Sequence, residues 1–500
     1  MIVLITILSY FLVLTLYSRF VTGRKSSNEA FFRGNRKSPW YMVAFGMVGA
    51  SISGITFVSV PGMVMKSGMS YLQTCIGFIF GYIAVAFILL PIYYKLNLTT
   101  IYTFLRDRVG QSGYKTGASF FLLSKMTGAA ARFYVVCMLL NDYVIGPMCP
   151  SVNSTLLFSV IVLAMVALIW LYTKSGGIKT LVWTDTLQTI CMFTALLLII
   201  YNVVNSLGMS FSDAAKAVWD SPMGLHTVSF DFVSILSGVF IVIVMTGLDQ
   251  DMMQKNLTCR SLRDAQKDMC SYGVAFVPAN LLFLCLGVLL VLLTSKMGMA
   301  LPASGDDLLP MFAATGVLGM SVVVLFTIGI MAASFSSADS ALTALTTTYC
   351  VDIRERADDE RLRHRVHIAM AVVFALCILA FRAFNSTSLI DAIYIMCSYT
   401  YGPLLGLFAY ALTNRQQLTP TTQQPSPNTQ HLAQPTGMLA RARTPIVCIA
   451  SPLLCYALDT VSTNYFSYHF GYELLMINGA ITYLGLCLLR IANSKRSFSR

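Results

Sequence analysis

The stretch MAASFSSADSALTALTTTYCVDI, residues 331–353, places hydroxyl and carboxyl side chains at regular intervals inside an otherwise apolar segment. Ser336, Asp339, Ser340, Thr343 and Thr347 recur at steps of three and four residues, which puts them on one face of a helix. A membrane helix with such a stripe must turn it toward the protein interior, because lipid offers no partners to polar groups. The stretch therefore predicts a bundle of membrane helices that encloses a polar centre.

The composition of the whole chain agrees with this prediction. Of 500 residues, 56% are hydrophobic and 11% are charged, whereas soluble domains carry about 25% charged residues. Apolar runs long enough to cross a bilayer recur along the chain and predict an all-α, polytopic membrane protein of about thirteen transmembrane helices. The first run lacks the basic start and cleavage site of a signal peptide, so we expect it to be retained. The predicted spans are 2–20, 42–64, 73–94, 118–140, 155–172, 181–204, 232–253, 270–294, 316–349, 367–382, 388–412, 445–458 and 470–489.

Charge predicts the orientation of these spans. The net charge is +12, and the basic residues collect in every second loop, while the loops between are acidic or nearly uncharged. By the positive-inside rule the N-terminus is outside and the C-terminus is cytoplasmic, in the cell (inner) membrane. This distribution indicates lipid rather than nucleic acid as the partner of the basic groups. The predicted cytoplasmic basic residues are Arg24, Lys25, Arg33, Arg36, Lys37, Arg106, Arg108, Lys115, Lys174, Lys179, Lys255, Arg260, Arg263, Lys267, Arg354, Arg356, Arg361, Arg363, Arg365, Arg441, Arg443, Arg490, Lys495, Arg496 and Arg500.

Enzyme classes find no support in the sequence. The 13 cysteines and five histidines show neither metal-ligand spacing nor a disulfide framework, and there is no phosphate-binding glycine loop of an ATPase. An intramembrane enzyme would need a nucleophile with a base, or a set of metal ligands. The Gln-, Thr- and Pro-rich segment 413–444 reads as a disordered cytoplasmic linker.

The second predicted helix has an irregular composition. Its segment GASISGITFVSVPG, residues 49–62, combines small residues with a proline. Unwound backbone is tolerated in a membrane where it is buried or lines a cavity, and its carbonyls can then bind a cation. The alternative is that the small residues only permit close helix packing.

The hydroxyl stripe fits the same chemistry. A monovalent cation needs several oxygens in place of its water shell, and neutral hydroxyls and carbonyls bind it weakly enough for release. Ser336 and Ser337 meet this requirement. Alternatively, these hydroxyls bond only their own helix backbone.

Five ordered segments carry a resemblance to a known family. The run SSADSALTALTTTYCVDI resembles the signature of the sodium:solute symporter family, with its serine pair, hydroxyl-rich stretch and closing Asp-Ile. AFFRGNRKSPW, SGGIKTLVWTDTLQ, GLDQDMMQKNL and YTYGPLLGLF are similar to further family segments in the same order. The resemblance covers nearly all of the chain before the linker.

The resemblance implies a fold of two inverted five-helix repeats, each with a discontinuous first helix. It also implies sodium as the co-transported ion, with no organic cofactor. The implied divisions are an extra N-terminal transmembrane helix with a basic cytoplasmic loop in 1–41, the first inverted repeat in 42–204, the second in 232–412, the linker in 413–444, and two additional helices with a basic tail in 445–500.

Family positions imply the ion sites. The main sodium site would use the carbonyls of Gly49, Ile52 and Ala333 with the hydroxyls of Ser336 and Ser337. A possible second sodium site would use Asp185, Asp339 and Ser340, so one or two sodium ions per cycle are both compatible with the sequence. Alternatively, Asp185 is a helix cap and Asp339 pairs with an intramembrane base.

Two intramembrane bases, Lys125 and Arg132, lie seven residues apart on one helix face. They either neutralise Asp339 or Asp185, or Arg132 binds a substrate carboxylate, for which its guanidinium is well suited. Ser53, Thr56 and Thr246 are the other tentative substrate-binding residues by family position. Sugar-transporting relatives typically carry longer polar side chains at Ile55 and Thr56, so carboxylates or sugar acids are favoured over neutral hexoses.

The expected function is sodium-coupled symport of a small organic solute by alternating access. The alternative is a membrane solute sensor or receptor with the same fold and no net transport. The expected partners are the solute, sodium and the lipid bilayer, with no nucleic acid and no obligate protein partner.

Overall fold

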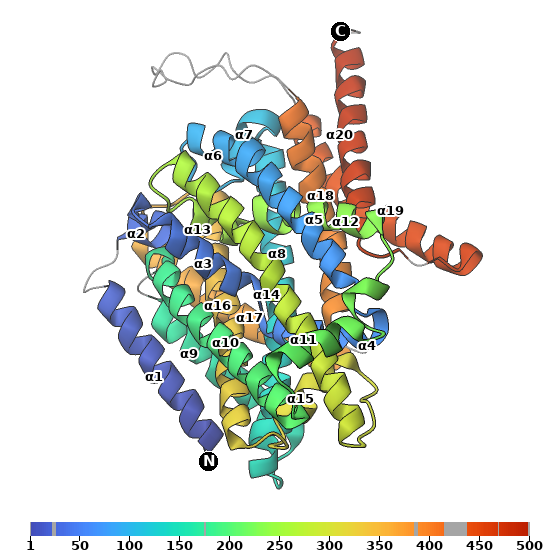
Figure 1. Ribbon diagram of the computed structural model, residues 1–500. Coiled ribbons are helices and arrows are strands. Elements are labelled where there is room, and N and C mark those ends of the chain that lie inside the picture. The colour runs from blue at the N-terminus through green and yellow to red at the C-terminus, as the bar shows by residue number, and fades with distance from the viewer. Residues whose placement is uncertain are drawn as a thin grey trace.

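The chain is almost entirely helical in the computed structural model, which describes residues 2–22, 27–174, 177–384, 389–414, 438–468 and 470–498 (Figure 1). Among these residues, 11 helices are long and apolar enough to cross a membrane, and up to 13 spans result if each of two bent helix pairs is one span. The expected polytopic all-α fold is therefore confirmed.

The helices follow the predicted spans closely. The first half of the chain contains α1 (Ile2–Thr22), α2 (Asn28–Arg33), η1 (Gly34–Arg36), α3 (Trp40–Ser51), α4 (Gly54–Ser67), α5 (Tyr71–Ala84), η2 (Val85–Leu89), α6 (Leu90–Lys95), α7 (Thr103–Val109), α8 (Gln111–Leu139), η3 (Leu140–Ile145), η4 (Gly146–Met148), α9 (Ser154–Thr173) and α10 (Gly177–Leu207). The second half contains α11 (Phe211–Asp220), η5 (Leu225–Thr227), α12 (Phe232–Val242), η6 (Ile243–Gly247), α13 (Gln250–Asn256), α14 (Leu262–Lys296), η7 (Gly305–Asp307), α15 (Leu308–Ala313), α16 (Met320–Thr348), η8 (Tyr349–Ile353), α17 (Glu360–Phe384), α18 (Leu389–Thr413), α19 (Met438–Phe466) and α20 (Leu474–Phe498). Most of the predicted linker 413–444 falls on residues 415–437, which lie outside the described residues. The prediction of disorder is wrong for residues 438–444, which form the first turns of α19.

Two interruptions of helical backbone position the site. α3 and α4 are bent by 62° about a break at Ile52 and Ser53. In the second half, η6 ends at Gly247, and α13 begins only after Leu248 and Asp249. The Asp249 side chain accepts a hydrogen bond from the Asp251 amide and so caps the new helix.

The helix with the polar stripe, α16, lies at the centre of the bundle. It packs against α10, α8, α3, α4 and α17, and α1 covers it from a further side (Figure 1). Phe335 makes edge-to-face contacts with Phe11 of α1 and Phe133 of α8, with ring centroids 4.7 and 5.4 Å apart. The stripe is therefore enclosed by protein on all sides rather than facing lipid.

The last two helices extend the bundle on the α18 side. α20 packs along α18, and the Asn478 amide donates to the Ser398 and Tyr399 carbonyls over 2.8 and 3.2 Å. Figure 1 places the start of α1 at one end of the bundle and the end of α20 at the opposite end.

Candidate functional site

The break between α3 and α4 frees backbone carbonyls inside the bundle. Ile52 still donates its amide to Val48, but Ser53 donates to the Ser51 carbonyl over 3.1 Å. In a continuous helix the Ser53 amide would bond to the Gly49 carbonyl, so the break releases that carbonyl. Small residues are required here, because a methyl group on Gly49 would overlap the side chain of Thr189 on α10. The backbone is interrupted here, so the alternative that the small residues only permit close packing is wrong, although Gly49 also packs closely against α10.

Ser337 of α16 reaches this break. Its hydroxyl lies 2.9 Å from the Ala50 carbonyl and 3.2 Å from the Ala333 carbonyl of its own helix. Ser337 is 8% exposed, so the contact is closed to lipid. The structure therefore brings together three of the elements predicted for the main sodium site: the unwound backbone near Gly49 and Ile52, the Ala333 carbonyl and the Ser337 hydroxyl.

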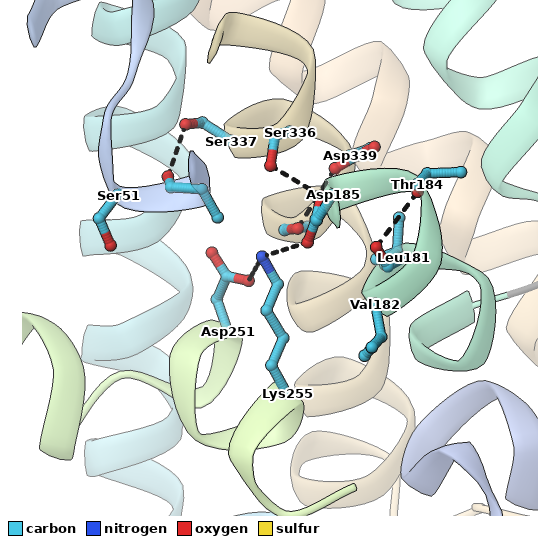
Figure 2. Close-up of polar contacts among 12 residues, drawn as sticks. Ser51, Leu181, Val182, Thr184, Asp185, Asp251, Lys255, Ser336, Ser337 and Asp339 are labelled. Atoms are coloured by element: carbon cyan, nitrogen blue, oxygen red, sulfur yellow. Dashed lines mark hydrogen bonds and ion pairs between the residues drawn. The ribbon is translucent and has the colours of Figure 1, made fainter. Parts of the chain in front are cut away.

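Ser336 points in a different direction from Ser337. Its hydroxyl donates to Oδ1 of Asp185 on α10 over 2.7 Å (Figure 2). Asp185 lies well inside α10 and is fully buried, so the alternative that it caps this helix is wrong. Ser336, which was predicted for the main site, thus contacts a residue predicted for the second.

Lys255 neutralises Asp185. Its Nζ lies 2.8 Å from Asp185 Oδ2 and 4.0 Å from Asp251 Oδ1 (Figure 2). The assignment of Lys255 to a cytoplasmic basic loop is wrong, because its side chain is only 2% exposed. The reason is that α13 is buried along its whole length, between α16, η6 and α3. The sequence signal was Asp251, four residues before Lys255 on the same helical face.

Asp339 of α16 has neutral hydrogen-bond partners. Tyr172 of α9 donates to its Oδ2 over 2.7 Å, and Ser340 donates to its Oδ1 over 3.2 Å. The predicted pairing of Asp339 or Asp185 with Lys125 is wrong. Lys125 pairs instead with Asp249 and Asp251, over 3.1 and 2.7 Å.

A cavity lies beside both helix breaks. All four residues proposed for substrate binding, Ser53, Thr56, Arg132 and Thr246, line it. Gly128, one helical turn before Arg132, also lines it, and a methyl group added there would meet no atom within 4 Å. The structure thus gathers predicted residues from α4, α8 and η6 around one space.

The two intramembrane bases differ in their partners. Lys125 is 5% exposed and is held by two carboxylates, of which Asp249 also accepts a hydrogen bond from Tyr401 over 2.7 Å. Among the described residues, none forms a hydrogen bond or an ion pair with Arg132. An unpaired guanidinium on a cavity wall is suited to bind an anion in two-point contact.

Aromatic residues that sequence reasoning missed complete the cavity wall. Tyr82, Tyr272 and Tyr401 line it, and Tyr272 shares a hydrogen bond with Ser51 beside the first break. These tyrosines come from α5, α14 and α18. Tyr401 lies within the family segment YTYGPLLGLF, but neither that segment nor the sequence around Tyr82 and Tyr272 predicts a place on a cavity wall. Only the tertiary fold reveals that they face the same space.

Comparison with known proteins identifies the chain. The model of the sodium:solute symporter family matches residues 31–416, which is well over half of the chain. The chain belongs to this family. It is a sodium-coupled solute symporter and not an enzyme, and the family resemblance of its motifs is confirmed.

Curated relatives are distant and differ in their cargo. The symporter is 23% identical to the sodium/sialic acid symporter NanT of Aliivibrio fischeri, over 79% of each chain. It is 24% identical to the human sodium-coupled monocarboxylate transporter 1, over 79% of this chain and 66% of that protein. A shorter match, 23% identical, covers 49% of this chain and 38% of the human sodium/iodide cotransporter.

Solved structures confirm the fold. A substrate-bound, outward-open Na+-coupled sialic acid symporter superposes with a TM-score of 0.77 at 17% identity, over 97% of this chain and 96% of that one. Mhp1, a nucleobase-cation-symport-1 family transporter, superposes with a TM-score of 0.55 at 14% identity, over 94% and 96% of the chains. The architecture is therefore shared with symporters of more than one family.

Proposed function

We propose that the symporter carries a small organic anion together with sodium, and that Arg132 binds the anion. The observation that carries this proposal is the unpaired guanidinium of Arg132 on the wall of the cavity between the two helix breaks. Arg132 is half-buried within a membrane-spanning helix, where a charged side chain typically faces a cavity or a binding partner. Lys125, seven residues earlier, has two carboxylate partners within the protein, whereas the partner of Arg132 would be the solute.

The relatives support a negatively charged cargo. Sialic acid, monocarboxylates and iodide, which appear in the names of three relatives, are all anions at neutral pH. The uncharged side chains of Ser53, Thr56 and Thr246 would contact the neutral part of the solute. A neutral hexose offers Arg132 no charge, and it is therefore disfavoured.

The main sodium site in this proposal lies between the first break and α16. The Gly49, Ile52 and Ala333 carbonyls would bind the ion with the Ser337 hydroxyl, which already contacts this backbone. Ser336 would have to leave Asp185 in order to contribute. Because the same break carries Ser53 and Thr56 of the cavity, an ion bound there fixes the backbone that the solute contacts.

Alternating access would then couple the two cargoes, with the N-terminus outside and the C-terminus in the cytoplasm. Sodium would join the broken helix to α16 and stabilise the form that binds the anion, and both would be released after the bundle closes outside and opens inside.

The test uses purified protein in proteoliposomes with N-acetylneuraminate, L-lactate and iodide as radiolabelled probes, in sodium or choline. We expect sodium-dependent uptake of at least one organic acid, and we expect Arg132→Gln to reduce it at least 100-fold. Thr127→Val, on the same helix with its hydroxyl bonded to Leu123 and Ser124 carbonyls, is the matched control and should retain uptake. Uptake unchanged by Arg132→Gln would contradict the role of this residue, and binding without uptake would indicate a sensor.

A further inference from the structure

The carboxylate predicted for a second sodium ion already contacts a cation of the protein itself. Asp185 Oδ2 lies 2.8 Å from the Lys255 ammonium, and its Oδ1 accepts the Ser336 hydroxyl over 2.7 Å. Both oxygens of this carboxylate therefore have partners from within the chain (Figure 2). An ammonium group and a sodium ion carry the same charge and are both attracted to carboxylate and hydroxyl oxygens.

We propose that the Lys255 ammonium permanently takes the place of a second sodium ion, so that the symporter binds one sodium ion per cycle. This inference rests on the main sodium site in the proposed function, which supplies that one ion. It assigns to Lys255 the role of setting the ratio of sodium to solute.

The position of Lys255 in the fold is that of a bridging ion. Lys255 lies on α13, which directly follows the second helix break, whereas Asp185 lies on α10 and Ser336 on α16. The ammonium thus links the helix after the second break directly to α10, and the shared carboxylate of Asp185 extends this link to Ser336 of α16. Unlike an ion, it cannot dissociate between cycles.

Burial favours the ammonium over a mobile ion at this position. The side chains of Lys255 and Asp185 are 2% and 0% exposed. Removal of either partner would leave an unpaired charge in the interior, which is far more costly than the intact pair. A sodium ion that entered beside Asp185 would meet the ammonium at close range, and the like charges would repel each other.

The neighbouring groups do not supply a separate acidic site for the ion. Asp251 is shared between Lys255 and Lys125, and Asp249 is bonded to Lys125 and Tyr401. Asp339 accepts hydrogen bonds from Tyr172 and Ser340. Each carboxylate near Lys255 thus has its own partners.

The same contacts connect the fixed cation to the solute cavity. From Lys255 the charges alternate through Asp251 and Lys125 to Asp249, and the last two residues line the cavity beside Arg132. The fixed ammonium is therefore part of the structure that holds the cavity wall, which is a second reason for it to remain bound throughout the cycle.

The experiment counts bound ions with sodium alone. Equilibrium binding of 22Na+ to the purified full-length protein, with N-methylglucamine as the inert cation, should give one ion per protein. Lys255→Met frees Asp185 and should give two ions, whereas Lys255→Arg keeps the fixed charge and should give one. Ser337→Ala should weaken the single site of the parent protein at least tenfold.

Asp185→Asn keeps the test decisive if Lys255→Met does not fold. The proposal expects one bound sodium ion in both the parent protein and Asp185→Asn, because Asp185 pairs with Lys255 and does not bind sodium. Two ions in the parent, falling to one in Asp185→Asn or Asp339→Asn, would overturn the inference. One ion in a folded Lys255→Met would also overturn it. Absence of binding to the parent would instead refute the main sodium site of the proposed function.

Discussion

At the scale of single residues, the adjacent Ser336 and Ser337 of α16 form hydrogen bonds with different parts of the protein. Successive residues on an α-helix point about 100° apart. Ser337 therefore reaches the Ala50 carbonyl at the first break, while Ser336 reaches Asp185 on α10. The sequence predicted both hydroxyls for one ion, because a shared motif does not show which side of the helix each neighbour occupies.

This divergence predicts unequal effects of removing the two hydroxyls. Ser337→Ala should raise the sodium concentration for half-maximal binding at least tenfold, whereas Ser336→Ala should change it less than threefold. A tenfold change corresponds to about 1.4 kcal/mol, the size of one hydrogen bond or ligand contact. Sodium-dependent thermal stabilisation measures both variants. Thr327→Ala, whose hydroxyl bonds the Val323 carbonyl on the same helix, is the control. Equal losses in both serine variants would contradict the assignment.

At the scale of elements, the sequence predicted where the helices lie in the chain better than which of their residues are buried or line the cavity. The 11 to 13 membrane spans of the described residues and the break after Gly49 followed from apolar length and small residues. The burial of α13 could not be predicted in this way, because its segment DQDMMQK contains three charged residues, as exposed loops often do. The spacing of four residues between Asp251 and Lys255 was the one indication that they pair inside the protein. The grouping of the tyrosines around the cavity could not be predicted either, since they come from three separate helices.

At Gly128, the face of α8 borders the cavity without contacting another side chain. A side chain at this position would extend into the cavity beside Arg132 without meeting other atoms. Gly128→Leu should therefore abolish uptake of the organic acid and leave 22Na+ binding within twofold of the parent. Gly128→Ala should keep uptake and gain up to about 1 kcal/mol in stability from better helix propensity. Full uptake in Gly128→Leu would place the solute elsewhere.

At the scale of the whole molecule, the helices beyond the family match at residue 416 are integrated into the bundle. α20 lies along α18, where Gly402 approaches the Asn478 side chain so closely that a methyl group would overlap it. The sequence predicted two extra helices here, but not their attachment to α18, because small residues alone do not identify a contact.

This attachment predicts a local cost to stability. Asn478→Leu removes the hydrogen bonds to the Ser398 and Tyr399 carbonyls and should lower the free energy of unfolding by about 1–3 kcal/mol. Thermal unfolding in detergent measures the loss. Asn202→Leu is the control, because the Asn202 amide bonds only the Leu198 carbonyl of its own helix. Equal stability of the two variants would show that the Asn478 side chain does not contribute to holding α20 against α18.

The proposed ratio of one sodium ion to one monovalent anion predicts transport without net charge. Uptake of L-lactate, if it is a substrate, should then be insensitive to a potassium diffusion potential set with valinomycin. A second sodium ion would add a charge, worth about 2.3 kcal/mol per 100 mV, which is roughly a fifty-fold change in accumulation. A Lys255→Met variant that still transports should acquire this voltage dependence. Voltage-dependent uptake in the parent protein would contradict the one-to-one ratio.

The break between α3 and α4 has a consequence for the evolution of this transporter. One side of the segment from Ala50 to Thr56 offers a carbonyl to Ser337, and its other side contributes Ser51, Ser53 and Thr56 to the cavity. A mutation that changes this segment to fit a different solute therefore also alters the proposed sodium site. Without a compensating change, sodium could cross the membrane without solute. Changes at cavity positions outside this segment, such as Gly128 and Thr246, are therefore expected to alter solute selectivity with less effect on sodium coupling.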